Sequence, residues 1–323
     1  MTAANRDAAS APFLTVVMPV HCGERWIEKT LDSLAAEATD GIEVVVVDGS
    51  PDSHTADIVM RYADRVSLEL IARPDLLNWR TKTNFGVECA RASHVCMLHQ
   101  DDLWLPGRIA AIRGWIEDAP QAVLHLAPTA IVDLNGRTLG TWRCPLPADA
   151  AAPAALVLER LLVQNFIAVP TPVFRRDAWL ACNGLDVDLW YTADWDLWLK
   201  LASRGPVHYH DLVTAGFRIH GSSLTMTGSR DPADFESQMR IVLDRHVGRL
   251  APARSAPVGR AAHASIKVNV ALAAASGGGF GALGKALVQL FLLGPRGLHR
   301  YLRDSRLFER VVPRLRAKLS GAL

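Results

Sequence analysis

The sequence predicts an α/β fold built on a mainly parallel sheet, and three observations support this prediction. Short apolar segments alternate with segments of helical periodicity over the first hundred or so residues. The apolar segments lack internal polar alternation, which is typical of strands buried on both faces of a parallel sheet. Acidic or polar residues follow directly after several of them, where open α/β sheets bind their ligands.

The expected strands of this first part are uninterrupted apolar runs bounded by polar residues, glycine or proline. They are Phe13–Met18, Ile42–Val47, Val66–Ile71 and Val95–Leu98. The helices expected between them carry apolar residues at helical spacing. They are Glu24–Ala36, Asp57–Tyr62 and Thr83–Arg91.

The pattern changes after Trp115, where we expect a mixed, partly antiparallel continuation with a hairpin turn at Asn135-Gly136. The Ala/Pro-rich stretch Pro145–Pro153 is expected to be a mobile loop. The further strands are expected at Ala122–Leu126, Ala130–Leu134, Thr171–Phe174, Val207–Tyr209 and Leu212–Ile219. The further helices are expected at Ala154–Val163, Asp177–Cys182 and Thr192–Ser203.

The last hundred or so residues lack such acidic strand ends, and we expect an α/β domain over residues 1–226 and a helical region over 227–323. Helices are expected at Asp234–Arg249, Arg260–Ala275 and Leu283–Leu293, followed by a basic, leucine-containing helical tail. This tail has two interpretations: it lies on an anionic membrane surface, or it packs on the first domain as a cap with a solvated basic face.

Composition excludes several classes of function. Half of the 323 residues are hydrophobic and the net charge is +2, so the chain has ample core and no bulk charge that favours nucleic acid. The five cysteines form no CxxC pair, which favours reduced thiols and argues against a zinc site. The sequence shows neither a signal-peptide core nor an uninterrupted apolar run long enough to span a bilayer, so we expect a cytoplasmic protein.

The most informative stretch is the strand end at His99-Gln100-Asp101-Asp102. Two carboxylates at the end of a buried strand suit a divalent cation that carries a diphosphate, because hard cations prefer carboxylate oxygens. The alternative is a helix N-cap followed by a surface acid.

Three further clusters have both a chemical and a structural interpretation. Asp48 follows the second strand, where an acid binds a base or ribose, although Asp-Gly-Ser-Pro is also a common turn. Asp194 begins a helix, where a carboxylate serves as a general base or simply complements the helix dipole. Arg218 and His220 close the last strand and suit a phosphate and a metal, or a structural role. The sequence contains no GxGxxG after its first strand, no GxxxxGK[ST] and no GxSxG.

In this order, the clusters resemble family 2 glycosyltransferases of the GT-A fold over Phe13–Thr225. The segments that carry the resemblance are Thr15–Ile27, Val44–Ser50, Lys82–Gly86, His99–Trp104, Asn183–Asp186, Ala193–Ala202 and Arg218–Thr225. The chain departs from the family pattern at His21, His99 and Ala193, which stand where Asn, Asp and Glu are usual.

The resemblance implies a role for each matching residue. It implies nucleotide-sugar contacts from Pro19, Val20, Glu24, Asp48, Asn84, Asp101 and Arg218. It implies Mg²⁺ or Mn²⁺ ligands at Asp101, Asp102 and His220, and a general base at Asp194. It implies acceptor contacts from Trp104, Gly184 and Asp196, and tryptophans such as Trp104, Trp190 and Trp195 suit either stacking on sugar rings or core packing.

The function implied is inverting transfer of a sugar from a UDP-, GDP- or dTDP-sugar to a saccharide or lipid-linked acceptor, in bacterial cell-surface polysaccharide assembly. Nucleic acid is not an expected partner, and peripheral contact with the inner face of the membrane through the basic C-terminal helices stays open. The alternatives are a non-catalytic nucleotide-sugar-binding relative and a sugar nucleotidyltransferase.

Overall fold

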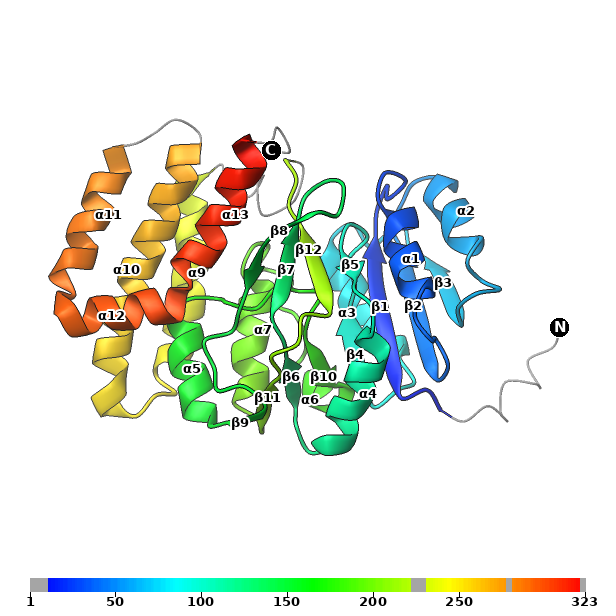
Figure 1. Cartoon of the computed structure of the whole chain (residues 1–323), viewed down its shortest axis with the longest axis horizontal. Helices are drawn as coiled ribbons and strands as arrows, with labels where there is room; N and C mark the ends of the chain where they lie inside the picture. Colours follow the sequence, from blue (N-terminus) through cyan, green and yellow to red (C-terminus); the bar gives the residue numbers. More distant parts are fainter. Residues whose placement is uncertain (1–10, 222–230, 277–280, 320–323) are drawn as a thin grey trace.

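A computed structural model describes residues 11–221, 231–276 and 281–319 of the chain. Its main sheet has the strand order β3-β2-β1-β4-β10-β6-β11-β9, and a smaller sheet has the order β5-β12-β7-β8 (Figure 1). The strands are β1 (Leu14–Val20), β2 (Ile42–Asp48), β3 (Leu68–Ala72), β4 (His94–Met97), β5 (Leu103–Trp104), β6 (Leu124–Leu126), β7 (Thr129–Val132), β8 (Thr138–Trp142), β9 (Ala150–Ala152), β10 (Val173–Arg175), β11 (Val207–Tyr209) and β12 (Ala215–Arg218).

Helices cover both faces of the main sheet. They are α1 (Ile27–Ala35), α2 (His54–Met60), α3 (Trp79–Cys89), α4 (Arg108–Asp118), α5 (Ala154–Val163), α6 (Arg176–Ala181) and α7 (Ala193–Ala202). Apolar residues of α1, α2 and α4 share one core with alternate residues of β1 and β2. Residues of α3, α5, α6 and α7 belong to a second core with Val17 of β1 and with Val95 and Met97 of β4. The predicted α/β fold with a mixed sheet is confirmed.

The carboxyl ends of β1, β2 and β4 meet at one edge of the sheet because these strands are parallel neighbours. Val20 at the end of β1 is paired with Asp48 at the end of β2, and Val17 is paired with Met97 of β4. Every residue of β1 and β2 is buried, as expected for strands covered on both faces. The acidic segments that follow these strands therefore gather at the same edge.

The second half of the sheet is mixed. β10 runs antiparallel to both β4 and β6, and β7 and β8 form the expected antiparallel hairpin, with Gly136 at a positive φ of 81° in its turn. The expected loop Pro145–Pro153 is wrong in part, because β9 lies within it. Ala152 of β9 is paired with Val207 of β11, so ladder hydrogen bonds order a stretch whose alanines carry no strand pattern.

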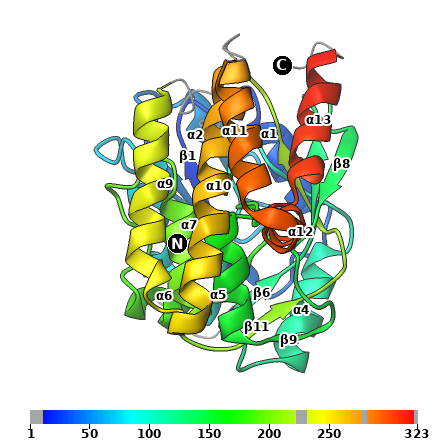
Figure 2. The same cartoon turned by 90° about the vertical axis from the view of Figure 1, so that its left-hand side faces the viewer.

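The C-terminal helices pack beside α5 and α7, away from β1 to β3 (Figures 1 and 2). They are α9 (Pro232–Val247), α10 (Pro252–Ser276), α11 (Gly281–Leu292), α12 (Gly294–Ser305) and α13 (Leu307–Leu319). Buried residues of α9, α10 and α12, including Met239, Ile266 and Tyr301, belong to the same core as those of α5 and α7. Ala317 of α13 instead packs with Ile131 and Ile219 in a smaller cluster. The helices therefore form a cap on the α/β region, one of the two interpretations of the tail. The expected domain boundary at residue 226 lies outside the described residues.

Within the described ranges, no helix combines the length and the apolar character needed to cross a bilayer.

Candidate active site

A cavity of about 800 Å³ opens at the carboxyl ends of the parallel strands. Pro19 and Val20 from the end of β1 line it, as do the residues after β4 and the start of α7. Helices α9, α10 and α13 contribute residues as well. This is the edge at which the topology predicts a ligand site.

The loop after β4 brings three potential metal ligands together. One ligand atom from each of His99, Asp101 and Asp102 lies within 4.8 Å of the others. His220 is adjacent, because its Nε2 lies 2.9 Å from Oδ2 of Asp101. The structure thus places all three expected ligands in one neighbourhood and adds His99, to which the family pattern assigned no role.

The two carboxyl groups differ in their protonation. Burial, and then the charge of Asp101, raise the pKa of Asp102 well above its ordinary value. Burial also raises the pKa of Asp101, but the hydrogen bond with His220 opposes burial, and the net shift of the pKa is downward. Two neighbouring buried carboxylates are not both ionised without a positive partner, so the pair favours a cation.

The donor set fits the divalent metal that the family resemblance implies. Carboxylate oxygens suit Mg²⁺ and Mn²⁺, and a neutral imidazole is a further ligand for Mn²⁺. Burial lowers the pKa of His99, which keeps its ring neutral, and its Nε2 is buried without a hydrogen-bond partner among the described residues. Such an atom costs free energy unless a ligand engages it.

Arg218 anchors the acidic loop His99–Asp102 and does not line the cavity. Its side chain is buried, and its guanidinium donates to the backbone carbonyls of Asp101, Asp133 and Leu134 at 2.8–2.9 Å. Its backbone N–H donates to Oδ1 of Asp102 at 3.0 Å. The structure therefore does not bring Arg218 to a nucleotide diphosphate as expected, but it makes Arg218 the anchor of both acidic residues.

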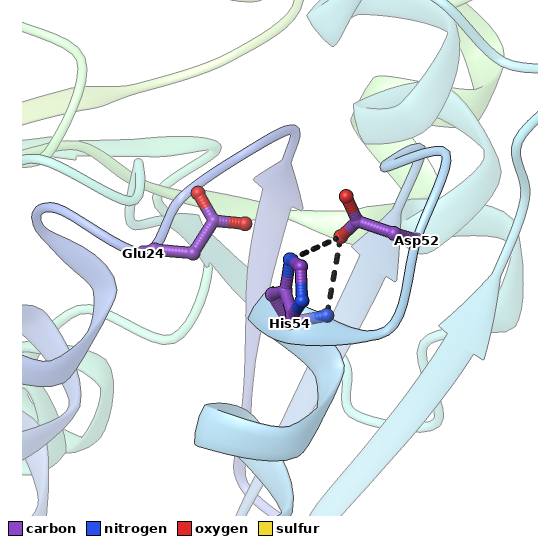
Figure 3. Close-up of side chains that lie close together, drawn as sticks. All are labelled: Glu24, Asp52 and His54. Atoms are coloured by element: carbon purple, nitrogen blue, oxygen red, sulfur yellow. Dashed lines mark hydrogen bonds and ion pairs between the residues drawn. The ribbon is translucent and has the colours of Figure 1, made fainter.

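Asp48 and Glu24, both expected to contact a nucleotide sugar, do not line the cavity, and they differ in burial. Asp48 is buried, and its Oδ1 accepts hydrogen bonds from the backbone N–H and the hydroxyl of Ser50 at 2.8 and 2.6 Å. Glu24 is exposed and forms a surface group with Asp52 and His54 (Figure 3). Its carboxylate accepts a hydrogen bond from Thr55 at 2.5 Å, so it does not line the cavity.

Lys82 is a cavity residue to which sequence analysis assigned no role. Its ammonium is buried beside Asp48 and donates to the carbonyl oxygen of Val20 at 2.8 Å. Burial lowers the pKa of Lys82, and Asp48 raises it. A buried cation at the end of β1 adds positive charge to the wall where a diphosphate would bind. Its position in the matched segment Lys82–Gly86 was the available signal.

Asp194 begins α7 and lines the same cavity as the acidic loop. Its Oδ2 accepts a hydrogen bond from Nδ2 of Asn165 at 3.0 Å, and its Oδ1 accepts one from the backbone N–H of Trp195 at 2.8 Å. Burial raises the pKa of Asp194 to about 6, although both hydrogen bonds lower it. A carboxylate with this pKa is ionised at neutral pH and is more basic than an ordinary aspartate.

Comparisons with known proteins found glycosyltransferases. Residues 15–152 match the family model described as Glycosyl transferase family 2. Over this segment, which is less than half of the chain and includes the acidic loop His99–Asp102, the sequence is similar to that family.

Curated relatives align with part of the chain. It is 23% identical to an uncharacterised glycosyltransferase of Rickettsia felis over 65% of this chain and 34% of that protein, so the chain spans about a third of that relative. It is 26% identical to the amylovoran biosynthesis glycosyltransferase AmsE of Erwinia amylovora, over 55% of this chain and 65% of AmsE.

Solved glycosyltransferases share the fold. The structure of S. aureus TarS 1-349 with UDP-GlcNAc matches with a TM-score of 0.64 at 18% identity, covering 93% of this chain and 88% of TarS. The Pyrobaculum calidifontis mannosyltransferase PcManGT with GDP-Man and Mn²⁺ matches with a TM-score of 0.52 at 17% identity, covering 95% and 87%. The expected GT-A fold is confirmed.

Three residues that we expected to contact the acceptor or the donor interact with other parts of the chain. Asn84 uses its amide to clamp Leu185, accepting from its N–H at 2.9 Å and donating to its carbonyl at 2.8 Å. Gly184, in the same turn, has a φ of 57°, and its carbonyl accepts a hydrogen bond from Lys200 at 3.1 Å. Trp104 is buried in β5 beneath the guanidinium of Arg108. The structure does not bring these side chains to the cavity.

Asp196 is also outside the cavity. It is fully buried and pairs with Lys200 at 2.7 Å and with His246 at 2.8 Å. Burial raises its pKa, but these two partners outweigh burial and lower the pKa to about 2. Asp196 therefore ties α7 to α9, a tertiary contact that the sequence did not indicate, and the expected acceptor contact loses its basis.

Aromatic residues line the part of the cavity near Asp194. Of the tryptophans expected to stack on sugars, Trp190 and Trp195 line the cavity. Their ring N–H groups donate to Asp234 at 2.6 Å and to the carbonyl of Leu161 at 2.8 Å. Trp142 of β8 joins them, which sequence analysis missed because the turn-rich stretch around it showed no functional pattern.

Proposed function

We propose that this chain transfers a sugar, with inversion, from a nucleoside-diphosphate sugar to a hydroxyl group of a saccharide or glycolipid. The observation that carries the proposal is that one cavity contains both the acidic loop His99–Asp102 and the basic carboxylate of Asp194. The two functions that such a reaction needs, a binding site for a diphosphate and a general base, therefore open onto the same space.

The donor half of the proposal uses the edge of the parallel sheet. Asp48 lies at the end of β2, where an acid suits the base or ribose, and Pro19 and Val20 supply the adjoining wall. A divalent metal would be held by Asp101 and Asp102, with His220 or His99 completing the donor set. When bound, this metal neutralises negative charge on the leaving diphosphate as a Lewis acid.

The proposed transfer step depends on Asp194 as its general base. In the proposed displacement, an acceptor oxygen forms a bond to the anomeric carbon while the bond from that carbon to the diphosphate oxygen breaks. The acceptor's proton passes to the carboxylate of Asp194, and the nucleoside diphosphate leaves. General-base assistance of this kind contributes about 10²–10⁴-fold.

The similar structures support a nucleotide-sugar donor without selecting one. TarS is described with UDP-GlcNAc and PcManGT with GDP-Man, so uridine and guanosine donors are both candidates, with dTDP-sugars as a further class. The likeness to AmsE supports a role in the assembly of a bacterial cell-surface polysaccharide.

Titration calorimetry of UDP and GDP, with and without Mn²⁺, tests the donor site. We expect one nucleotide to bind with a requirement for the metal, and Asp102→Ala to abolish this binding. Asp52→Ala is the matched control, since Asp52 belongs to the exposed surface group of Figure 3 and should leave binding unchanged. If neither nucleotide binds in a metal-dependent way, the proposed donor site is wrong.

Product analysis separates the proposal from its alternatives. A transferase releases a nucleoside diphosphate from the donor, and Asp194→Asn should reduce this release while preserving nucleotide binding. Release of pyrophosphate from a nucleoside triphosphate and a sugar phosphate would instead identify a nucleotidyltransferase. Metal-dependent nucleotide binding without turnover on any hydroxyl acceptor would identify a non-catalytic binding protein.

We also propose that the C-terminal helices contact an anionic membrane surface. α11 exposes Phe291 and Leu292, whose side chains are 82% and 70% accessible, and Lys285 and Arg296 are exposed nearby in sequence. Apolar side chains next to basic ones suit the boundary of an anionic bilayer. Phe291→Ser should weaken sedimentation with phosphatidylglycerol vesicles, whereas Leu180→Ser on α6 should not; equal sedimentation of both variants would contradict the contact.

A further inference from the structure

The last helix, α13, packs against β8 (Figure 1), and two of its residues line the cavity. Pro313 packs against Gly140 so closely that a Cβ atom at position 140 would lie 2.8 Å from its ring. The carboxylate of Glu309 accepts a hydrogen bond from the backbone N–H of Arg143 at 2.7 Å, and Ala317 is fully buried. These contacts set which side of α13 faces the cavity.

Two arginines on that side, one turn apart, line the cavity: Arg310 and Arg314. Nη2 of Arg310 donates to Oδ1 of Asn269 at 2.9 Å, and Nη1 of Arg314 donates to the carbonyl oxygen of Arg310 at 2.7 Å. Nη1 of Arg310 is buried and has no hydrogen-bond partner in the described part of the chain. A guanidinium donor left in this state is unfavourable unless a ligand accepts from it.

These arginines differ from three other arginines of the C-terminal region, which pair with carboxylates. Arg300 pairs with Glu159, Arg303 with Asp304, and Arg306 with Glu309. Among the described residues, no carboxylate forms an ion pair with either cavity arginine. Burial, and then the charge of Arg314, lower the pKa of Arg310 to about 10, and burial lowers the pKa of Arg314, but both guanidinium groups stay protonated at neutral pH. Two uncompensated charges that share one wall attract an anion.

The pair lies on the side of the cavity where an acceptor must bind. Tyr191, another cavity residue, is close enough to interact electrostatically with both arginines and with the base Asp194. The donor diphosphate already has a positive partner in Lys82 and a cation site in the acidic loop.

We propose that Arg310 and Arg314 bind an oxyanion group of the acceptor substrate, which makes an anionic acceptor the preferred substrate class. The identification of the ligand as an acceptor rests on the proposed function, whereas the anion-binding site itself does not depend on it. A guanidinium recognises phosphate and carboxylate oxygens through paired hydrogen bonds. The oxyanion therefore belongs either to a phosphate group, as in a phosphorylated glycan or lipid, or to the carboxylate of an acidic sugar.

Calorimetric titration with methyl phosphate and with glucuronate, in buffer containing EDTA so that no metal occupies the acidic loop, tests the site. We expect the full-length protein to bind at least one probe, and Arg310→Gln to weaken this binding about ten- to a hundredfold, as for a lost hydrogen bond to a charged group. Arg310→Lys should retain part of the affinity. Arg316→Gln is the matched control, because Arg316 lies on the same helix outside the cavity and donates to the carbonyl of Leu139.

Each outcome is informative. Preference for methyl phosphate supports a phosphate-bearing acceptor, and preference for glucuronate supports an acidic saccharide. Failure of the wild type to bind either probe, or equal binding by Arg310→Gln, overturns the site. Loss of metal-dependent nucleotide binding in Arg310→Gln would assign the arginines to the donor and overturn it as well. Anion binding that persists where no nucleotide binds would contradict the proposed function and leave the oxyanion site standing.

Discussion

The hydrogen bond from Asn165 to Asp194 offers a direct test of the general base. Asn165→Ala removes a donor that lies 3.0 Å from Oδ2 of Asp194 and lowers the pKa of this carboxyl. A hydrogen bond to a charged group contributes roughly 1.5–3 kcal/mol. Since one pKa unit corresponds to about 1.4 kcal/mol, the pKa of Asp194 should rise from about 6 by roughly one to two units.

The measurement is the pH dependence of kcat/KM for nucleoside-diphosphate release, which reports ionisations of the free enzyme. The general base acts in its ionised form, so activity rises with pH through the pKa of Asp194. The acidic limb should lie near pH 6 in the wild type and move to about pH 7–8 in Asn165→Ala. Asn269→Ala is the control, because Asn269 lines the same cavity and its amide binds Gln164 and Arg310. An active Asn165→Ala enzyme whose acidic limb has not moved would refute the assignment of Asp194.

Three further predictions concern stability. Gly184→Ala should cost at least about 2 kcal/mol in the free energy of unfolding, measured by urea titration, because φ is 57° and the new Cβ would lie 2.5 Å from Oδ1 of Asn84. Asp196→Ala breaks a buried ion pair and should lower the free energy of unfolding by about 3–5 kcal/mol without changing metal-dependent nucleotide affinity in the folded protein. An unchanged free energy of unfolding would contradict the inference that Asp196 holds α7 against α9. Burial, and then the charge of His210, lower the pKa of His125 to about 3 in the folded protein. As the pH falls, His125 is therefore protonated in the unfolded chain before it is protonated in the folded one, and the free energy of unfolding decreases below about pH 6.5. At pH 5 this loss is about 2 kcal/mol for His125, and unfolding titrations should show a weaker pH dependence in His125→Gln.

The sequence predicted those elements whose local pattern and tertiary environment agree. The apolar run at Ile42–Val47 becomes β2, and Ala154–Val163 becomes α5 with the same bounds. β9 could not be predicted, because Ala150–Ala152 has no strand propensity and is ordered only by pairing with β11. Pairing of this kind depends on a partner that lies more than fifty residues away in the chain.

The site was predictable where the sheet topology alone decides position. Asp101 and Asp102 follow a buried parallel strand, which places them at the ligand-binding edge whatever the side chains around them do. Arg218 and Asn84 also lie in matching segments, but their donors are used by backbone carbonyls that belong to distant loops. A motif specifies which residue stands at a position, whereas its hydrogen-bond partners are set by the tertiary fold.

The basic tail shows the same limit of prediction from sequence, in the part of the cavity where we propose that the acceptor binds. In the sequence, Arg310 and Arg314 look like Arg300 and Arg303, since all four recur on helices rich in arginine and leucine. Only the fold separates them, because Arg300 and Arg303 reach carboxylates while the other two face the cavity. The acidic loop His99–Asp102 follows a strand end, whereas Arg310 and Arg314 belong to α13, so we expect substitutions in this helix to alter the proposed acceptor preference without disturbing the acidic loop.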